Sequence, residues 1–180
     1  MITAEGLRRL GEHREILDAT NVFPIPDSDT GTNLFLTLGE ASHAVGDVPE
    51  SAPPAVVARA AARGSLVGAR GNSGVIVSQY LGALLASDAT GALPGIEDAA
   101  ASVAALDRAA ASARRAVARP VEGTVLTVAR AVADGARQLL AHVEVSLVRA
   151  DKERTAAEKA KARREQELTA AYASGMTRWR

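Results

Sequence analysis

The chain has 180 residues, of which 47% are hydrophobic, enough for one domain with a sizeable core, so wholesale disorder is not expected. Its 21 basic and 21 acidic side chains cancel, and no global field draws it to nucleic acid or to an anionic membrane. It has no cysteine, which excludes disulfides and Cys-ligated zinc, and no apolar run approaches the ~18 residues of a membrane span, so we expect a soluble cytoplasmic protein.

Apolar residues at helical spacing predict helices separated by loops rich in glycine and proline. The first helix covers about residues 3–19, with Thr3 as its N-cap, and ends before Pro24 and Pro26, which hold the backbone extended. A second helix opens on the polar loop that follows, a third comes after the linker 46–53, and a fourth after the glycine-rich stretch 64–74. After a turn at 91–95, a fifth helix covers about 97–118 and a sixth starts near Gly123. Because no stretch alternates with the period of two that strands require, we predict an all-α fold.

The same spacing predicts which side chains face the core. Aromatic residues make up only 3% of the chain, so we expect a core of small side chains that lets the helices pack closely. The residues expected to point inward are Leu7, Leu10 and Leu17 of the first helix, Leu34, Leu38, Ala41 and Val45 of the second, Ile76, Tyr80 and Leu84 of the fourth, and Val125, Val128, Val132, Leu139, Val143 and Leu147 of the sixth.

The C-terminal segment differs from the rest of the chain. Residues 151–167 read DKERTAAEKAKARREQE, which is helix-prone, mixed in charge and almost without apolar side chains. The favoured interpretation is a solvated helical extension. A nucleic-acid-binding arm is the alternative, and the interleaved acidic residues argue against it. We therefore divide the chain into a domain of residues 1–150 and a charged helical tail of residues 151–180, and expect no nucleic-acid partner.

Asp27 and Asp29 form the strongest local feature. Two carboxylates two residues apart on a proline-stiffened loop can converge on a hard cation such as Mg²⁺, and Asn21 could bring a third oxygen. The next residues open a helix whose free N–H groups attract phosphate, and Gly31 removes a Cβ where a phosphate would approach. The alternative is a turn with an N-cap and no ligand. An EF-hand is excluded, because Leu38 stands where that loop needs its glutamate.

Two further segments place small polar residues where a helix opens. Residues 68–74 (GARGNSG) lack the Gly-Lys-Ser/Thr ending of a Walker A loop and the strand and spacing of a dinucleotide fingerprint. They can still offer amides and the Ser73 hydroxyl to an anion; the alternative is a flexible turn with Asn72 as a cap. Residues 123–127 (GTVLT) suit the edge of a base or ribose pocket, or are an ordinary helix start.

The remaining polar residues support no other catalytic class. The three histidines have no metal-ligand spacing, and Ser28 has no evident histidine partner for a nucleophilic triad. No lysine precedes Lys152, so phosphate charge must be met by metal, by backbone amides, or by arginines such as Arg63, Arg70 and Arg130.

Together, the three segments resemble the signatures of the DhaL (DAK2) domain. That is the nucleotide-binding domain of dihydroxyacetone kinases and the N-terminal domain of bacterial fatty acid kinase. The matching segments are residues 21–33 (NVFPIPDSDTGTN), 68–74 (GARGNSG) and 120–127 (PVEGTVLT). Their amino-acid sequences resemble the fatty-acid-kinase branch more than the dihydroxyacetone-kinase branch. The resemblance covers about residues 5–148 and implies an antiparallel helical barrel or bundle of the DhaL type, with the nucleotide bound at one end.

The resemblance implies a role for each matching residue. Asp27 and Asp29 match the aspartates that bind two Mg²⁺ ions on the phosphates of ATP or ADP. Asn21 lies near a further metal ligand of the dihydroxyacetone kinases, one residue out of register. Thr124 and Leu126 would border the adenosine. The remaining nucleotide-binding residues implied are Thr30, Gly31, Thr32, Asn33, Asn72, Ser73 and Gly74.

The implied activity is that of a phosphotransferase, a kinase domain or subunit acting on a substrate that a partner protein presents. Phosphoryl transfer needs positioning and charge neutralisation more than a protein nucleophile. In the fatty-acid-kinase branch a fatty-acid-binding protein presents the carboxylate. A dihydroxyacetone kinase subunit with bound ADP or ATP and a non-catalytic nucleotide-binding module are the alternatives. The charged tail replaces a Gly-rich segment that completes the barrel in the family, so we expect either a compact variant that works with partners or a truncated relative with a weakened site.

Overall fold

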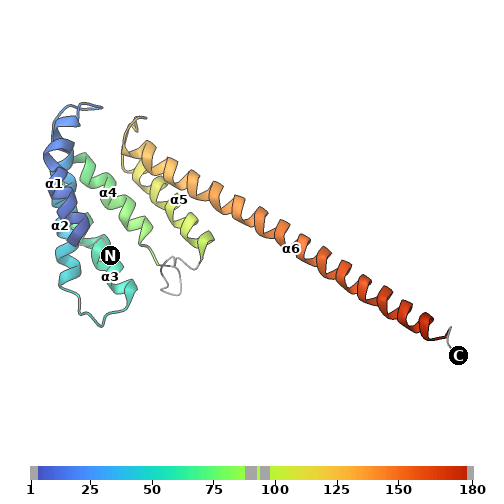
Figure 1. The fold of residues 1–180 in the computed structure, drawn as a ribbon. Coiled ribbons are helices and arrows are strands. Elements are labelled where there is room, and N and C mark those ends of the chain that lie inside the picture. The colour runs from blue at the N-terminus through green and yellow to red at the C-terminus, as the bar shows by residue number, and fades with distance from the viewer. Residues whose placement is uncertain (1–3, 88–92, 94–97, 178–180) are drawn as a thin grey trace. The chain divides into compact units, whose positions relative to one another are not determined.

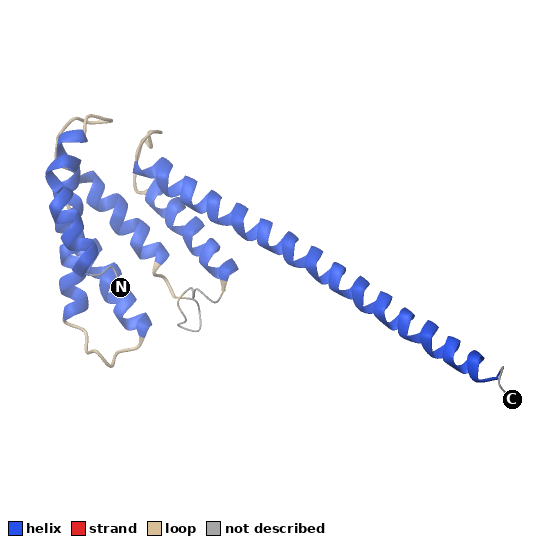
Figure 2. Cartoon of the chain, in the orientation of Figure 1, coloured by secondary structure: helices blue, strands red, loops and turns tan. Residues whose placement is uncertain are grey.

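Six α-helices make up the described part of the chain, and no strand occurs among these residues (Figures 1 and 2). The computed structural model describes residues 4–87, 93 and 98–177, and of residues 171–177 it describes the backbone alone. The all-α prediction is confirmed. The helices are α1 (Ala4–Thr20), α2 (Thr30–Gly46), α3 (Pro54–Val67), α4 (Gly71–Leu84), α5 (Ala99–Arg115) and α6 (Val125–Thr177).

The helices fall into two compact units, Met1–Arg137 and Gln138–Arg180. The first unit contains α1 to α5 and the first turns of α6, and the second contains the rest of α6. Within the first unit, α2 is central, because it packs against α1, α3 and α4, while α5 packs on α4 (Figure 1). Motif residues from α2 and α4 are therefore carried by helices that touch.

Local sequence explains where several helices begin. Pro54 opens α3, since its missing N–H is one that a first helical turn leaves unpaired in any case. Asp98 caps α5 in the ordinary way, by accepting a hydrogen bond from the N–H of Ala101 at 2.8 Å. The helical spacing thus finds the elements, although the expected N-cap Thr3 and most of the expected turn at 91–95 lie outside the described residues.

The glycine-rich stretch 64–74 is mostly helical, which differs from the expected loop. Helix α3 continues to Val67 and α4 begins at Gly71, so three residues connect them. The glycine at position 64 serves helix packing, because a Cβ there would lie 2.6 Å from the Cβ of Ala44 on α2. Glycine in this segment allows close approach between helices rather than a long flexible turn.

The core consists of small side chains, as the composition predicts. Alanines of α2, α3, α5 and α6 fill most of it, and the largest fully buried side chains are Thr37, Ser65 and Ser78. Side chains of this size let the helix axes come close. Because a buried hydroxyl group needs a hydrogen-bond partner, the serines and threonine of the core bond to backbone groups. Ser65 and Ser78 donate to carbonyls three residues earlier in their own helices.

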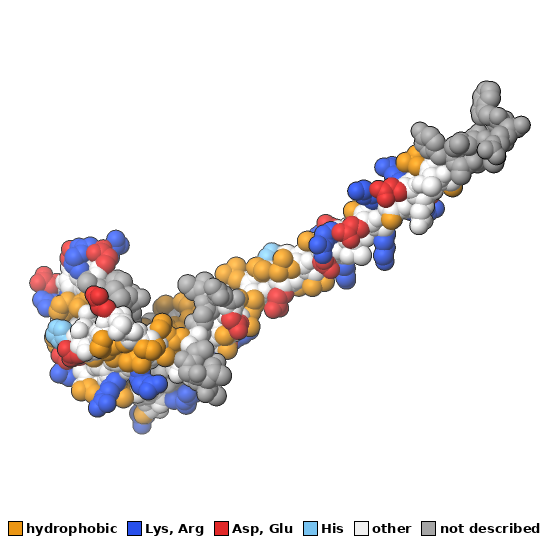
Figure 3. Space-filling model, turned by 90° about the horizontal axis from the view of Figure 1, so that it is seen from below, with side chains coloured by type: hydrophobic (Ala, Val, Ile, Leu, Met, Phe, Trp, Pro, Cys, Tyr) orange, Lys and Arg blue, Asp and Glu red, His pale blue; other side chains and the backbone are white. Residues whose placement is uncertain are grey.

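The predicted inward face of the sixth helix is wrong. Its six apolar residues, named above, are 45% to 68% exposed, whereas Leu126 and Ala133 are buried on another side of α6. That buried side is the one toward α5, where Asp107 pairs with Arg130 and Arg137. Figure 3 shows apolar side chains at the surface of α6, followed by mixed charges toward its C-terminus. Helical spacing marks an apolar face, but which face is covered depends on the neighbouring helices.

Candidate nucleotide site

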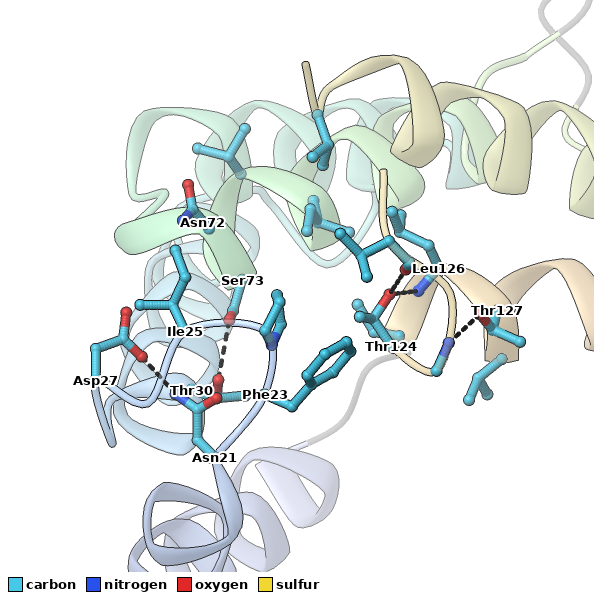
Figure 4. A pocket seen from close by; sticks show the side chains of 18 of the residues that line it. Asn21, Phe23, Ile25, Asp27, Thr30, Asn72, Ser73, Thr124, Leu126 and Thr127 are labelled. Atoms are coloured by element: carbon cyan, nitrogen blue, oxygen red, sulfur yellow. Dashed lines mark hydrogen bonds between the residues drawn. The ribbon is translucent and has the colours of Figure 1, made fainter. Parts of the chain in front are cut away.

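A cavity of about 910 Å³ lies in the first unit. Its walls come from the end of α1, the loop after it, the first turns of α2 and α4, and the segment that leads from α5 into α6 (Figure 4). The cavity therefore joins parts of all three motif segments. The predicted site residues that line it are Asn21, Asp27, Asp29, Thr30, Asn72, Ser73, Thr124 and Leu126.

The two aspartates lie at the polar end of the cavity, and neither is used to cap a helix. Asp29 is the N-cap residue of α2, yet its side chain makes no capping hydrogen bond. The side chain of Asn21 donates from Nδ2 to Oδ1 of Asp27 at 2.5 Å, so Asn21 turns its amide nitrogen toward that carboxylate. Between the aspartates, Ser28 adopts a positive φ of 51°, and the chain bends at this residue. The loop is therefore more than a turn with an N-cap, because the Asp29 side chain makes no capping hydrogen bond.

The first turns of α2 and α4 meet at the same end. The hydroxyl groups of Thr30 and Ser73 lie 3.2 Å apart, across 43 residues of sequence (Figure 4). Like Asp29, the N-cap residue of α4, Arg70, makes no side-chain capping hydrogen bond. Two helices of 17 and 14 residues thus bring their N-termini together, and the positive ends of their dipoles favour an anion there.

Asp18, which the sequence did not single out, holds the start of α2 from α1. Its carboxylate accepts from the backbone N–H of Thr32 at 3.0 Å and from the Thr32 hydroxyl at 2.7 Å. These two hydrogen bonds, with a further one from the N–H of Gly31, lower the pKa of Asp18. Thr32 was expected to contact phosphate or metal, but its hydroxyl is engaged with Asp18 and does not line the cavity.

Three more of the predicted residues, Gly31, Asn33 and Gly74, are buried and do not line the cavity. A Cβ at position 31 would lie 2.3 Å from the carbonyl oxygen of Arg14, so this glycine is needed for the packing of α1 on α2. Asn33 is 9% exposed, and its Nδ2 has no hydrogen-bond partner among the described residues. Any contact of Gly31 or Gly74 with a ligand would have to come through the backbone.

Thr37 is a second residue that sequence reasoning missed. It is fully buried on α2, donates from its hydroxyl to the carbonyl of Asn33 at 2.7 Å, and accepts from the N–H of Arg70 at 3.1 Å. The side chain thereby ties α2 to the residue before α4, and Gly74 leaves room for it. A threonine inside a helix carries no sequence signal for this role.

The other end of the cavity is mainly apolar. Phe23 exposes more than half of its side chain there and lies toward Thr124, whereas Ile25 lies nearer to Asp27 and Ser73 (Figure 4). Thr124 caps α6 by accepting from the N–H of Leu126 at 3.3 Å, and Gly123 adopts a φ of +80° beside Phe23. Flat apolar surfaces with hydroxyl groups at the edge fit an aromatic base and its sugar.

Charge around the site comes from few side chains. Arg119, which carries no motif signal, lines the cavity. Arg130, a candidate for meeting phosphate charge, instead pairs with Asp107 and Asp134. Glu122 has a lowered pKa, because the Thr127 hydroxyl and Arg114 bind its carboxylate. The site therefore relies on amide groups and on Arg119 for positive potential.

Comparison with known proteins gives the family. A family model described as the DAK2 domain matches residues 24–176. The chain belongs to the DAK2 domain family. The match agrees with the resemblance of the three motif segments and with the all-helical fold, and it extends past residue 148 into the charged tail.

Curated relatives of this DAK2 domain include proteins of Bacillus subtilis and Staphylococcus saprophyticus. Protein YloV of Bacillus subtilis is 39% identical over 143 residues, which is 79% of this chain and 25% of YloV. The uncharacterized protein SSP1546 of Staphylococcus saprophyticus is 40% identical over 135 residues, which is 74% of this chain and 24% of that protein. The chain thus spans about a quarter of the length of these relatives. Within the described residues, no helix has the length and apolar character to cross a membrane.

The donor set of this DAK2 domain fits a metal that is shared with a ligand. No group of three or more His, Cys, Asp or Glu side chains that could hold an ion occurs among the described residues. Mg²⁺, however, is commonly held by one or two carboxylates together with phosphate oxygens and water. Asp27 and Asp29, beside two helix N-termini that favour phosphate, supply the protein's part of such a site.

Proposed function

We propose that this DAK2 domain binds Mg-ATP in the cavity and serves as the nucleotide-binding part of a phosphotransferase. One observation carries the proposal: the carboxylate of Asp29 does not cap its helix and stands in a cavity where the N-termini of α2 and α4 converge. Cations and phosphates then have adjacent partners. We assign this role to residues 1–150, which contain every lining residue, and regard residues 151–180 as a charged helical extension.

In this proposal, Asp27 and Asp29 hold two Mg²⁺ ions on the phosphates, with Asn21 fixing Asp27 through the hydrogen bond described above. Bound magnesium supplies charge neutralisation for phosphoryl transfer. The chain's own groups do the binding: the hydroxyls of Thr30 and Ser73 and the amides in the first turn of α4 contact phosphate. The base and ribose occupy the apolar end, against Phe23 and beside Thr124.

The acceptor in this proposal is presented by another protein. In this proposal the carboxylates and hydroxyls that line the cavity bind metal and phosphate, so the chain contributes positioning and charge neutralisation to the transfer. The sequences of the three motifs favour the fatty-acid-kinase branch, in which the acceptor is the carboxylate of a fatty acid held by a binding protein. Incubation with ATP, magnesium, fatty acid and such a binding protein should yield acyl phosphate. Phosphorylation of dihydroxyacetone with its own partner subunit would place the chain in the other branch, and ATP binding without turnover in both mixtures would mark a non-catalytic module.

Calorimetry tests nucleotide binding directly. Wild-type protein should bind ATP in the presence of magnesium and bind it much more weakly after chelation of the metal. Asp27→Ala and Asp29→Ala should each abolish the magnesium-dependent part of the affinity. Asp47→Ala, at the opposite end of α2, removes the same charge and should leave binding unchanged. No heat of binding by the wild-type chain with magnesium present would refute the proposal.

A further inference from the structure

The capping of α2 is unusual when compared with that of α5 in the same chain. Both helices follow an aspartate at the N-cap position, Asp29 for α2 and Asp98 for α5. Asp98 accepts from the N–H three residues later, at Ala101, which is the ordinary N-cap bond. Asp29 does not accept from the corresponding N–H, that of Thr32. Identical side chains at identical helix positions are therefore used differently.

The N–H of Thr32 is satisfied from another helix. Asp18, near the end of α1, accepts this N–H with one carboxylate oxygen and the Thr32 hydroxyl with the other. The approach is close, because Gly31 lets the backbone of α1 come within the distance that a Cβ would occupy. A carboxylate from α1 thus occupies the place at the start of α2 that the N-cap side chain would fill.

We propose that Asp18 is a positioning residue, whose hold on Thr32 keeps the Asp29 carboxylate in the cavity for the metal. The effect of Asp18 on metal binding rests on the proposed function. The capping of α2 by Asp18 in place of Asp29 does not depend on it. If Asp18 is removed, the N–H of Thr32 loses its partner, and Asp29 at the N-cap position can then accept it, as Asp98 accepts the N–H of Ala101. Helix α2 then remains capped, and the cavity loses a carboxylate.

Binding measurements test the consequence. Asp18→Ala should weaken magnesium-dependent ATP binding by about 10- to 100-fold, the range typical for the loss of a residue that orients a metal ligand. Asp18→Asn keeps an acceptor for the Thr32 N–H and should retain most of the affinity. Glu15→Ala removes the same charge from an exposed position on α1 and serves as the control. Equal affinities of the Asp18→Ala and Glu15→Ala variants would overturn the inference.

Thermal unfolding without ligand tests the structural part separately. In the wild-type background, Asp29→Ala removes no capping bond, whereas in the Asp18→Ala background it removes the replacement cap. Asp29→Ala should therefore lower Tm by about 2–4 °C more in the Asp18→Ala background than in the wild-type background. An identical change in Tm in both backgrounds would overturn the inference even if the protein binds Mg-ATP. If the wild type binds no Mg-ATP but the coupling is found, the proposed function fails and the role of Asp18 in freeing Asp29 stands.

Discussion

The buried hydroxyl of Thr37 accepts a hydrogen bond from the backbone N–H of Arg70 at 3.1 Å, and this contact joins α2 to the start of α4. The same hydroxyl donates to the carbonyl of Asn33. Because the helix N-termini at the cavity belong to these two helices, a single side chain in the core helps to fix the spacing of the polar end of the site. Removal of the Thr37 hydroxyl should therefore lower the stability of the protein.

Thr37→Val should reduce the free energy of unfolding by about 1–3 kcal/mol, because the part-buried N–H of Arg70 loses its hydrogen-bond partner. Burial of apolar area alone predicts the opposite sign, since valine has the same shape and is more apolar. Urea denaturation measures the change. Thr155→Val, which removes a hydrogen bond of the same local kind at an exposed position of α6, is the control and should change stability by less than about 0.5 kcal/mol. A neutral Thr37→Val variant would contradict the structural role.

Gly31→Ala should destabilise the protein by roughly 1–3 kcal/mol, because the new Cβ would collide with the carbonyl of Arg14 and push α1 away from α2. Gly39→Ala lies on the same helix with no atom within 4 Å of its Cβ. That variant should gain about 0.5–1 kcal/mol from helix propensity. Chemical denaturation of both variants measures whether each substitution raises or lowers the free energy of unfolding. If both substitutions stabilise, α1 does not pack on α2 as described.

The ion-pair cluster between α5 and α6 should make stability depend on acid pH. Hydrogen bonds from Arg137 lower the pKa of Asp107, and Arg130, then Arg137, lower the pKa of Asp134 to about 2. A carboxylate whose pKa is lower in the folded state contributes stability above its unfolded value of 3.8, and that stability is lost as pH falls toward the folded value. Thermal melts between pH 5 and 2 should therefore show a shallower fall for Asp134→Asn than for the wild type. Asp47→Asn should follow the wild-type curve, and high salt should weaken the effect because the pairs are exposed.

Phe23→Ala should weaken ATP binding by about tenfold, because base–aromatic stacking is worth about 1–3 kcal/mol and this ring stands at the apolar end of the cavity. Inorganic tripolyphosphate with magnesium carries no base, so its affinity should not change. Val22→Ala, at an adjacent residue that is 72% exposed and does not line the cavity, is the matched control. An equal loss for ATP and tripolyphosphate would show that Phe23 supports the phosphate end instead.

Much of the site could be read from residue order, since its motifs are local. Residues 27–33 combine aspartates, a glycine and hydroxyls ahead of a helix, and this pattern indicates metal and phosphate chemistry wherever the helix packs. The structure brings Asp27, Asp29, Thr30 and Ser73 to one cavity. The contributions of Asp18 and Thr37 could not be read in this way. Each acts on a residue 14 or 33 positions away, and an aspartate or threonine in a helix has no pattern that names its partner.

The sequence by itself determined the elements and their chemistry: helices wherever apolar residues recur every three or four positions, a core of alanine-sized side chains, and carboxylates beside a helix N-terminus. Only the tertiary structure decided which of these features are used. It left the valine and leucine stripe of α6 exposed and turned the buried side of that helix toward α5. It also gave the cap of α2 to Asp18 and so freed Asp29. The physical reason is range: helix formation follows from neighbours along the chain, whereas burial and hydrogen-bond pairing depend on which helices come into contact.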